Sequence, residues 1–244
     1  MISERVELSE VQRLALPKSE RVDIWLCRLE ASANCIAAFQ PLITSEEREL
    51  ASRFLSDRAR NRFTVGRGVL RSLLAGYLSE PPSEVELVIE QFGKPRVAGD
   101  SICFNLAHSG DWLLLGFAMD NEVGVDIERH RPVAHERGIA ERCFSPREIA
   151  SFQAADVRLR QEQFFRLWTR KEAAVKWHGS GLQLLLSKID VPLDEPRQGE
   201  ITIVEEDRSC WVRSLDAPAG YSAALATTRP CAWMVQRELV LRQS

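Results

Sequence analysis

The segment Phe164–Leu182, FFRLWTRKEAAVKWHGSGL, constrains the fold more than any other part of the chain. Its apolar residues recur at helical spacing, which predicts one helix, and Gly179 stands where helices commonly end. Glu172 and Lys176 are four residues apart, so they share one face of this helix. Taken alone, such a pair is typical of a surface salt bridge.

A second acidic segment changes that interpretation. In GVDIE, Gly124–Glu128, Asp126 and Glu128 alternate with apolar residues. If this segment is a strand, both carboxylates point to the same face, roughly 6–7 Å apart. The sequence thus predicts that three carboxylates and a lysine meet where the helix of Glu172 crosses this strand. Carboxylates without histidine or cysteine partners favour Mg²⁺, which also binds substrate phosphates.

Composition limits the other possibilities. The chain has 244 residues, 45% hydrophobic residues and a formal net charge of −3, so general affinity for nucleic acid is not expected. The 6 cysteines form no C-x-x-C pair and are expected to be free thiols. We find neither a signal-peptide pattern at the N-terminus nor the ~20 apolar residues that span a bilayer. We therefore expect a cytoplasmic protein without a membrane segment.

Hydrophobic periodicity and capping signals predict an α+β fold of two similar halves with pseudo-two-fold symmetry. The halves are 1–119 and 120–244, with a ligand cleft between them. Each contains a strand, a helix, a long helix and antiparallel strands, whereas residues 1–20 are expected to be irregular. The short link Asp120–Asn121 predicts that the strands 112–119 and 122–128 are antiparallel neighbours. The predicted strands are 22–30, 85–90, 101–107, 112–119, 122–128, 200–205, 210–215, 221–227 and 232–236, and the predicted helices are 45–55, 57–79, one from Ser145, and 158–177.

Basic residues in the first half are candidates for binding a phosphorylated substrate. Lys94 lies in a Gly/Pro turn, and His108 lies in a tight polar link between two strands. Guanidinium groups match phosphate geometry, although a solvated helix face is the more common reason for arginines along a helix. Those arginines are Arg60, Arg62, Arg67 and Arg71.

Five motifs carry a resemblance to a known family. They occur in the order FGKP (92–95), FNLAHSG (104–110), GVDIE (124–128), FSPREIASF (144–152) and WTRKEAAVKWHGSGL (168–182). In this order the motifs resemble those of the 4′-phosphopantetheinyl transferases of the surfactin-synthetase-activating type. The resemblance runs from about Thr44 to Leu182.

The resemblance implies a reaction and a set of roles. The phosphopantetheine arm of coenzyme A would move to a serine of an apo acyl, peptidyl or aryl carrier protein, releasing 3′,5′-ADP. The chain would act as a monomer, because its cleft lies within one chain. Glu172 would also be the general base, and Lys176 would assist the leaving phosphate. The implied metal ligands are Asp126, Glu128 and Glu172, and the implied coenzyme A contacts are Lys94, Asn105, Leu106, Ala107 and His108.

Two positions depart from the family pattern. Ala107 replaces the usual serine, which removes one hydroxyl contact to coenzyme A. Leu50 replaces a basic residue that meets the 3′-phosphate in relatives, a role that Arg48 or Arg53 would have to take over. Two other functions remain open, a carrier-binding module with weak turnover and a Mg²⁺-dependent phosphohydrolase.

Overall fold

Two β-sheets lie side by side in the centre of the molecule. The computed structural model describes residues 4–18, 20–90, 92–99, 102–179, 186–191, 198–203 and 208–241. The first sheet has the order β1-β11-β2-β6-β5, the second has the order β7-β10-β9-β8, and β3 and β4 form a separate hairpin. The strands are β1 (Glu4–Glu7), β2 (Arg21–Arg28), β3 (Leu87–Ile89), β4 (Pro95–Val97), β5 (Ile102–Ser109), β6 (Trp112–Met119), β7 (Val123–Arg129), β8 (Gln198–Ile203), β9 (Arg208–Leu215), β10 (Tyr221–Thr227) and β11 (Trp233–Val240).

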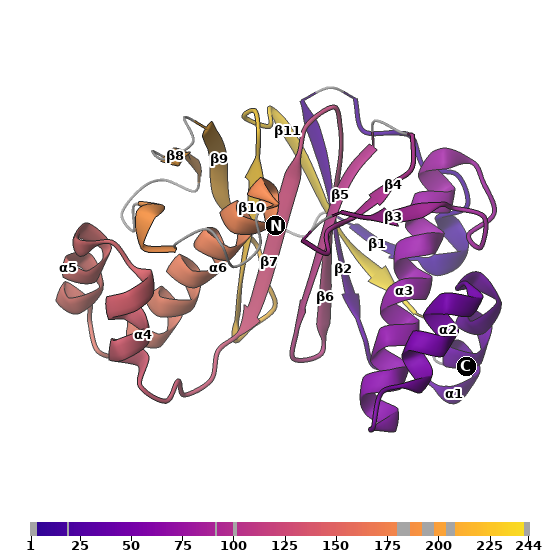
Figure 1. The fold of residues 1–244 in the computed structure, drawn as a ribbon, viewed down its shortest axis with the longest axis horizontal. Helices are drawn as coiled ribbons and strands as arrows, with labels where there is room; N and C mark the ends of the chain where they lie inside the picture. Colours follow the sequence, from indigo (N-terminus) through magenta and orange to yellow (C-terminus); the bar gives the residue numbers. More distant parts are fainter. Residues whose placement is uncertain are drawn as a thin grey trace.

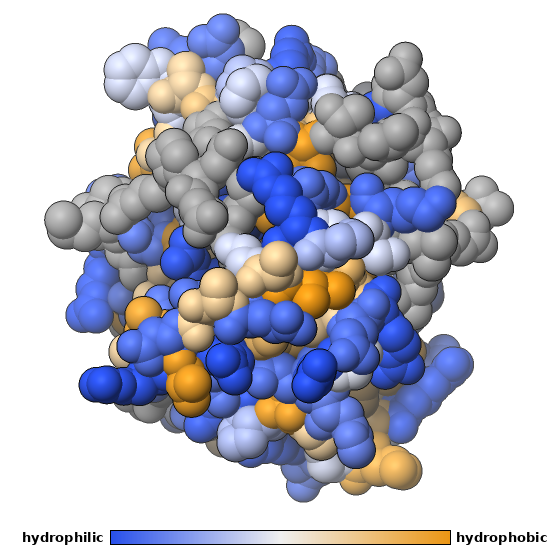
Figure 2. All heavy atoms as spheres, turned by 90° about the vertical axis from the view of Figure 1, so that its left-hand side faces the viewer, coloured by the Kyte–Doolittle hydropathy of each residue, from blue (hydrophilic) through white to orange (hydrophobic). Residues whose placement is uncertain are grey.

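Helices cover the outer face of each sheet, so the molecule has four layers (Figure 1). Helices α1 to α3 lie beside the first sheet, and α4 to α6 lie beside the second. On the side where α4 and α5 lie, the surface is mostly hydrophilic with small apolar patches (Figure 2). The helices are α1 (Ala33–Phe39), α2 (Ser45–Ser52), α3 (Asp57–Leu78), α4 (Glu136–Cys143), α5 (Pro146–Ala154) and α6 (Arg160–His178), with short 3-10 turns η1 (Leu8–Glu10), η2 (Gln40–Leu42) and η4 (Leu186–Lys188).

Three clusters of buried apolar side chains hold these layers together. The first joins α3 to the outer face of the first sheet and includes Leu70 and Leu113. The second joins α6 to the second sheet and includes Val175. The third lies between the two sheets and includes Leu114 and Ile127. Alternate residues of one strand thus enter different clusters, as the two-residue period of a strand requires.

Helix α6 packs closely on β7 because Gly124 has no side chain. A Cβ atom at this position would lie 2.1 Å from the carbonyl oxygen of Ala173 and 2.2 Å from the amide nitrogen of Trp177. The glycine of GVDIE therefore sets the distance between the strand and the helix that carry the predicted acids.

Several predictions from the sequence are confirmed. The fold is α+β, α3 and α6 occupy their predicted positions, and α6 ends at Gly179. Capping boxes, the signals that predicted α2 and α5, form at Thr44 and Glu47 and at Ser145 and Glu148. Among the described residues, no helix combines the length and apolar character needed to cross a membrane.

The predicted pairing of the strands on either side of Asp120–Asn121 is wrong. β6 lies in the first sheet, whereas β7 pairs with β10 in the second. The link changes sheets because Asn121 is buried and its side-chain oxygen accepts a hydrogen bond from the backbone of Arg229 (3.1 Å). Asp120 enters this turn with a left-handed backbone (φ +49°).

Elements also form in two segments for which the sequence predicted neither helix nor strand. Within residues 1–20, β1 pairs in parallel with β11, and α4 forms in the polar connection that precedes Ser145. The predicted boundary at 119/120 stays a prediction. The chain passes from the first sheet to the second at this point, but its later strand β11 lies in the first sheet again. The end of the motif at Leu182 lies outside the described residues.

Candidate active site

Strand β7 and helix α6 bring the acidic residues and the lysine together. Asp126 is 5% exposed, and its Oδ1 accepts a hydrogen bond from Lys176 Nζ at 2.7 Å. The ion pair therefore joins strand to helix, although a pair with Glu172 along the helix was the simplest expectation. The other oxygen, Asp126 Oδ2, is buried and has no hydrogen-bond partner among the residues that the structure describes.

Glu172 lies close enough to both acids of β7 to be affected by their charges. Burial raises the pKa of Glu172, and the negative charge of Asp126 raises it further. The pKa of Asp126 is also raised by burial, an effect that its ion pair with Lys176 opposes. These groups compete to carry negative charge, which is typical of a site that accepts a proton or a cation.

The oxygen ligands suit a hard divalent cation. In the described part of the chain, no group of three or more His, Cys, Asp or Glu side chains is arranged to hold a metal ion as it stands. The unpartnered Oδ2 of Asp126 nevertheless offers a buried ligand atom, and Glu128 and Glu172 add further carboxylates. An oxygen-only donor set of this kind matches the preference of Mg²⁺.

A pocket of about 490 Å³ opens between α3 and the first sheet. His108 lines the pocket and lies close enough to Lys176 and Glu128 for their charges to affect its pKa. Loss of hydration lowers the pKa of His108, and the charge of the neighbouring Arg62 lowers it further, which favours the neutral form of the ring. The pocket is lined by Leu29, Phe54, Ser56, Arg58, Ala59, Arg62, Phe63, Gly66, Arg67, Leu106, His108 and Leu113.

Three arginines of α3 line this pocket. Arg58 and Arg62 donate to the same Asp111 oxygen, at 3.0 and 3.1 Å. Arg67 lies over the ring of Phe63 and 3.9 Å from Glu47. An apolar floor with cationic side chains suits a ligand that combines an organic group with phosphate.

The residues of FNLAHSG divide between two faces of β5. Leu106 and His108 line the pocket. Asn105 faces β7, where its Oδ1 accepts a hydrogen bond from the amide of Val125 (3.0 Å). Ala107 is buried in the cluster between the two sheets. A serine at position 107 would therefore meet β7 before it met a ligand in the pocket.

Lys94 immediately precedes β4, and its side chain is largely buried. Its Nζ pairs with Glu122 Oε2 at 2.9 Å and donates to the carbonyl of Val123 at 3.3 Å. Its side chain is only 9% exposed. In this structure the lysine therefore holds the β3–β4 hairpin against the start of β7.

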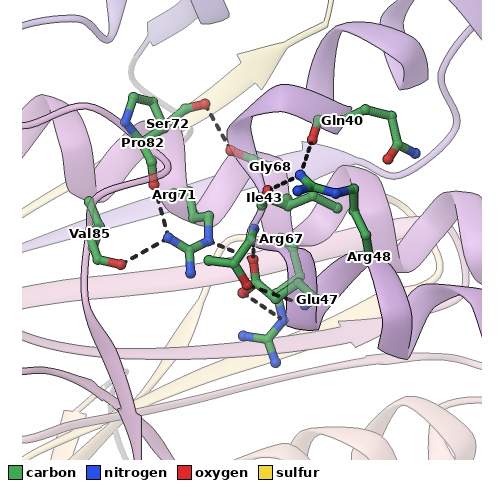
Figure 3. A network of polar contacts seen from close by, with 11 residues as sticks. Gln40, Ile43, Glu47, Arg48, Arg67, Gly68, Arg71, Ser72, Pro82 and Val85 are labelled. Carbon is green, nitrogen blue, oxygen red and sulfur yellow. Dashed lines mark hydrogen bonds and ion pairs between the residues drawn. The ribbon is translucent and has the colours of Figure 1, made fainter.

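Arg48 and Arg53, the suggested substitutes for a basic residue at Leu50, have other partners. Arg48 donates to the carbonyls of Gln40 (3.0 Å) and Ile43 (2.5 Å), as Figure 3 shows. Arg53 pairs with Glu49 on the exposed surface of α2.

The neighbouring arginines of α3 divide between the core and the pocket. Arg71 is buried against Glu47 and two carbonyls, so one of the four helix arginines belongs to the core (Figure 3). The arginines that reach the pocket are instead Arg58, Arg62 and Arg67. The sequence indicated Arg62 and Arg67 by their place on the helix, but nothing in it distinguished them from Arg71, and Arg58 was missed.

Comparisons with known proteins cover both halves of the chain. The profile of the 4′-phosphopantetheinyl transferase superfamily matches residues 122–226, and the profile of the 4′-phosphopantetheinyl transferase N-terminal domain matches 30–119. The chain is 35% identical to the 4′-phosphopantetheinyl transferase HetI of Nostoc sp. over 72% of this chain and 75% of HetI. It is 29% identical to the transferase Sfp of Bacillus subtilis over 79% of this chain and 85% of Sfp.

A solved structure shows a weaker likeness. The holo-[acyl-carrier-protein] synthase of Thermotoga maritima matches 43% of this chain and 61% of its own, with 19% identity and a TM-score of 0.32. The sequence matches carry the assignment, because they extend over most of this chain and of HetI. The chain therefore belongs to the 4′-phosphopantetheinyl transferase superfamily and is an enzyme of the type represented by Sfp and HetI.

Proposed function

We propose that this enzyme transfers the 4′-phosphopantetheine arm of coenzyme A to a serine of an apo acyl, peptidyl or aryl carrier protein, in a Mg²⁺-dependent reaction that releases 3′,5′-ADP. One observation carries the proposal. Glu128 of β7 and Lys176 of α6 lie close enough to His108 for their charges to affect its pKa, and His108 lines a pocket that three arginines also line. Membership of the transferase family supports coenzyme A as the donor and a carrier protein as the acceptor.

In the proposed reaction, the serine Oγ bonds to the phosphorus that carries the pantetheine arm, and the bond from that phosphorus to 3′,5′-ADP breaks. Glu172 accepts the serine proton, and its raised pKa makes it a stronger base. Lys176, held at Asp126, stabilises the charge that develops on the leaving phosphate.

Asp126, Glu128 and Glu172 are the residues that would hold Mg²⁺. The unpartnered Asp126 Oδ2 and the all-carboxylate donor set support this assignment. When bound, the ion supplies positive charge that neutralises the phosphate oxygens. Lys176 keeps Asp126 Oδ1 occupied, so Oδ2 is the oxygen available to the ion.

The pocket beside His108 is the proposed site for the 3′-phosphate end of coenzyme A. We expect Arg62→Ala and Arg67→Ala each to raise the Kd of coenzyme A about tenfold or more, because each removes a charged hydrogen-bond donor. Dephospho-coenzyme A, which lacks the 3′-phosphate, should bind all variants alike. Isothermal titration calorimetry with both ligands measures the difference.

Arg53→Ala is the matched control, since Arg53 is exposed and paired with Glu49. The outcome that contradicts this placement is a larger loss of coenzyme A affinity in Arg53→Ala than in either α3 variant. That result would move the 3′-phosphate to α2, the location that the family pattern implies. Lys94 remains a proposed coenzyme A contact, although a ligand would have to share it with Glu122.

The nucleotide products test the proposed function against its alternatives. Incubation with coenzyme A, Mg²⁺ and an apo carrier should yield 3′,5′-ADP and holo carrier in equal amounts. Omitting the carrier or chelating the metal should stop the release of 3′,5′-ADP. Nucleotide release without a carrier would indicate a phosphohydrolase, and carrier binding without release would indicate a binding module. Action as a monomer and a cytoplasmic location stay predictions.

A further inference from the structure

Side chains of β5 bond to the backbone of β7, although the two strands belong to different sheets. Asn105 Oδ1 accepts from the amide of Val125 (3.0 Å), and Ser109 Oγ accepts from the amide of Arg129 (3.1 Å). The two contacts are four residues apart on both strands and follow the same direction. These two side chains thus satisfy amides of β7 that need a partner, as the backbone of a neighbouring strand does within a sheet.

The hydroxyl of Ser109 makes a second bond. It donates to Glu128 Oε2 at 2.7 Å, an oxygen that also accepts from the more exposed Arg131 at 3.2 Å. A serine hydroxyl can donate and accept at once, and Ser109 uses both capacities on neighbouring residues of β7. The carboxylate of Glu128 is therefore tied to the first sheet as well as to its own strand.

The turn that follows Ser109 is fixed by a residue of the second sheet. Gly110 has a left-handed backbone (φ +54°), and a Cβ atom there would lie 2.3 Å from the hydroxyl of Tyr221. The amide of Asp111 donates to the same hydroxyl at 3.2 Å. Both ends of this short turn are thus attached to the half of the molecule that carries the acids.

We propose that Asn105 and Ser109 are positioning residues, which lock β5 to β7, and that Ser109 orients the Glu128 carboxylate for the metal ion. This inference rests on the proposed function. It places Asn105 and Ser109 on the face of β5 opposite the pocket residues Leu106 and His108. Asn105, expected from the family resemblance to contact coenzyme A, here acts through β7.

Ser109→Ala tests the proposal, with Ser109→Thr as the variant that retains the hydroxyl. Ser72→Ala is the matched control, because it removes a buried serine hydroxyl that bonds to Gly68 on α3 (2.8 Å). Three measurements are made on each full-length variant. They are Mn²⁺ affinity by electron paramagnetic resonance with coenzyme A present, the Kd of coenzyme A, and hydrogen exchange at the Arg129 amide.

We expect Ser109→Ala to lower Mn²⁺ affinity about 10–100-fold, the usual effect of removing a partner that orients a metal ligand. The Arg129 amide should exchange faster. The Kd of coenzyme A should stay within about twofold, because the pocket lies on the other face of β5. Ser109→Thr and Ser72→Ala should bind Mn²⁺ like the parent.

Unchanged Mn²⁺ affinity and unchanged Arg129 exchange in Ser109→Ala would overturn the inference and leave the proposed function intact. If the parent itself binds no Mn²⁺ and transfers without a divalent ion, the metal part of the proposed function fails instead. The positioning role is then decided by turnover. Equal turnover of Ser109→Ala and Ser72→Ala would overturn it, and a loss confined to Ser109→Ala would support it.

Discussion

In Glu172→Gln, we expect carrier modification to slow by about three or more powers of ten, because the proposed base and one proposed metal ligand are lost together. Lys176→Ala should lose less, about 10²–10³-fold, as when one group that stabilises transition-state charge is removed. Both variants should still bind coenzyme A, since the pocket lies on α3 and β5. Single-turnover transfer to an apo carrier measures both effects.

The melting temperature and a control on the same helix separate chemistry from folding. Glu162→Gln neutralises an exposed acid in the first turn of α6 and should transfer like the parent. If Glu172 and Lys176 only supported a salt bridge, each variant would lose a few tenths of a kcal/mol of stability and keep its turnover. Normal transfer by Glu172→Gln would therefore remove the residue from the catalytic machinery.

Lys171→Met should be the most destabilising single change considered, at a cost of about 3–5 kcal/mol. Lys171 is fully buried beside Glu172, and its Nζ lies 2.7 Å from Glu148 Oε2. It also donates to the carbonyls of Leu186 and Ile189, so three acceptors surround it. Burial lowers the pKa of Lys171 and raises that of Glu148, effects that their ion pair opposes.

A double variant shows whether the unpaired charge of Glu148 causes the loss of stability in Lys171→Met. Lys171→Met with Glu148→Gln leaves no unpaired charge in the core and should recover part of the lost free energy of unfolding. Arg137→Ala, which breaks the exposed pair with Glu141, should cost at most about 1 kcal/mol. Urea denaturation measures all three, and a loss in Lys171→Met no larger than in Arg137→Ala would contradict the buried ion pair's role.

The sequence predicted which acidic residues and which lysine share a face, because that follows from the spacing of residues within one strand and within one helix. The two-residue period of β7 and the four-residue spacing on α6 place Asp126, Glu128, Glu172 and Lys176 on facing surfaces. The pairing of Lys176 with Asp126 depends on how helix and strand cross, which no local pattern contains. The same holds for Lys171, which is adjacent to Glu172 in a charged segment yet points into the core.

For the fold, too, elements with local sequence signals could be predicted, whereas pairing between distant strands could not. Capping signals and periodicity identified α3, α5 and α6, whereas the pairing predicted from the short link Asp120–Asn121 is wrong. The parallel insertion of β11 between β1 and β2 joins segments more than 200 residues apart, and pairing of that range leaves no local signal. The short helices α1 and α4 were missed because about two turns give too few residues to establish a period.

The most direct test of the central claim is the intact mass of apo carrier proteins after incubation with this enzyme, coenzyme A and Mg²⁺. Acyl, peptidyl and aryl carriers are compared, each with a partner variant in which the acceptor serine is alanine. The account predicts that at least one carrier gains the mass of one phosphopantetheine arm, that its alanine variant gains nothing, and that Glu172→Gln slows the gain. Carriers of unchanged mass, from an enzyme preparation that still cleaves coenzyme A, would contradict it.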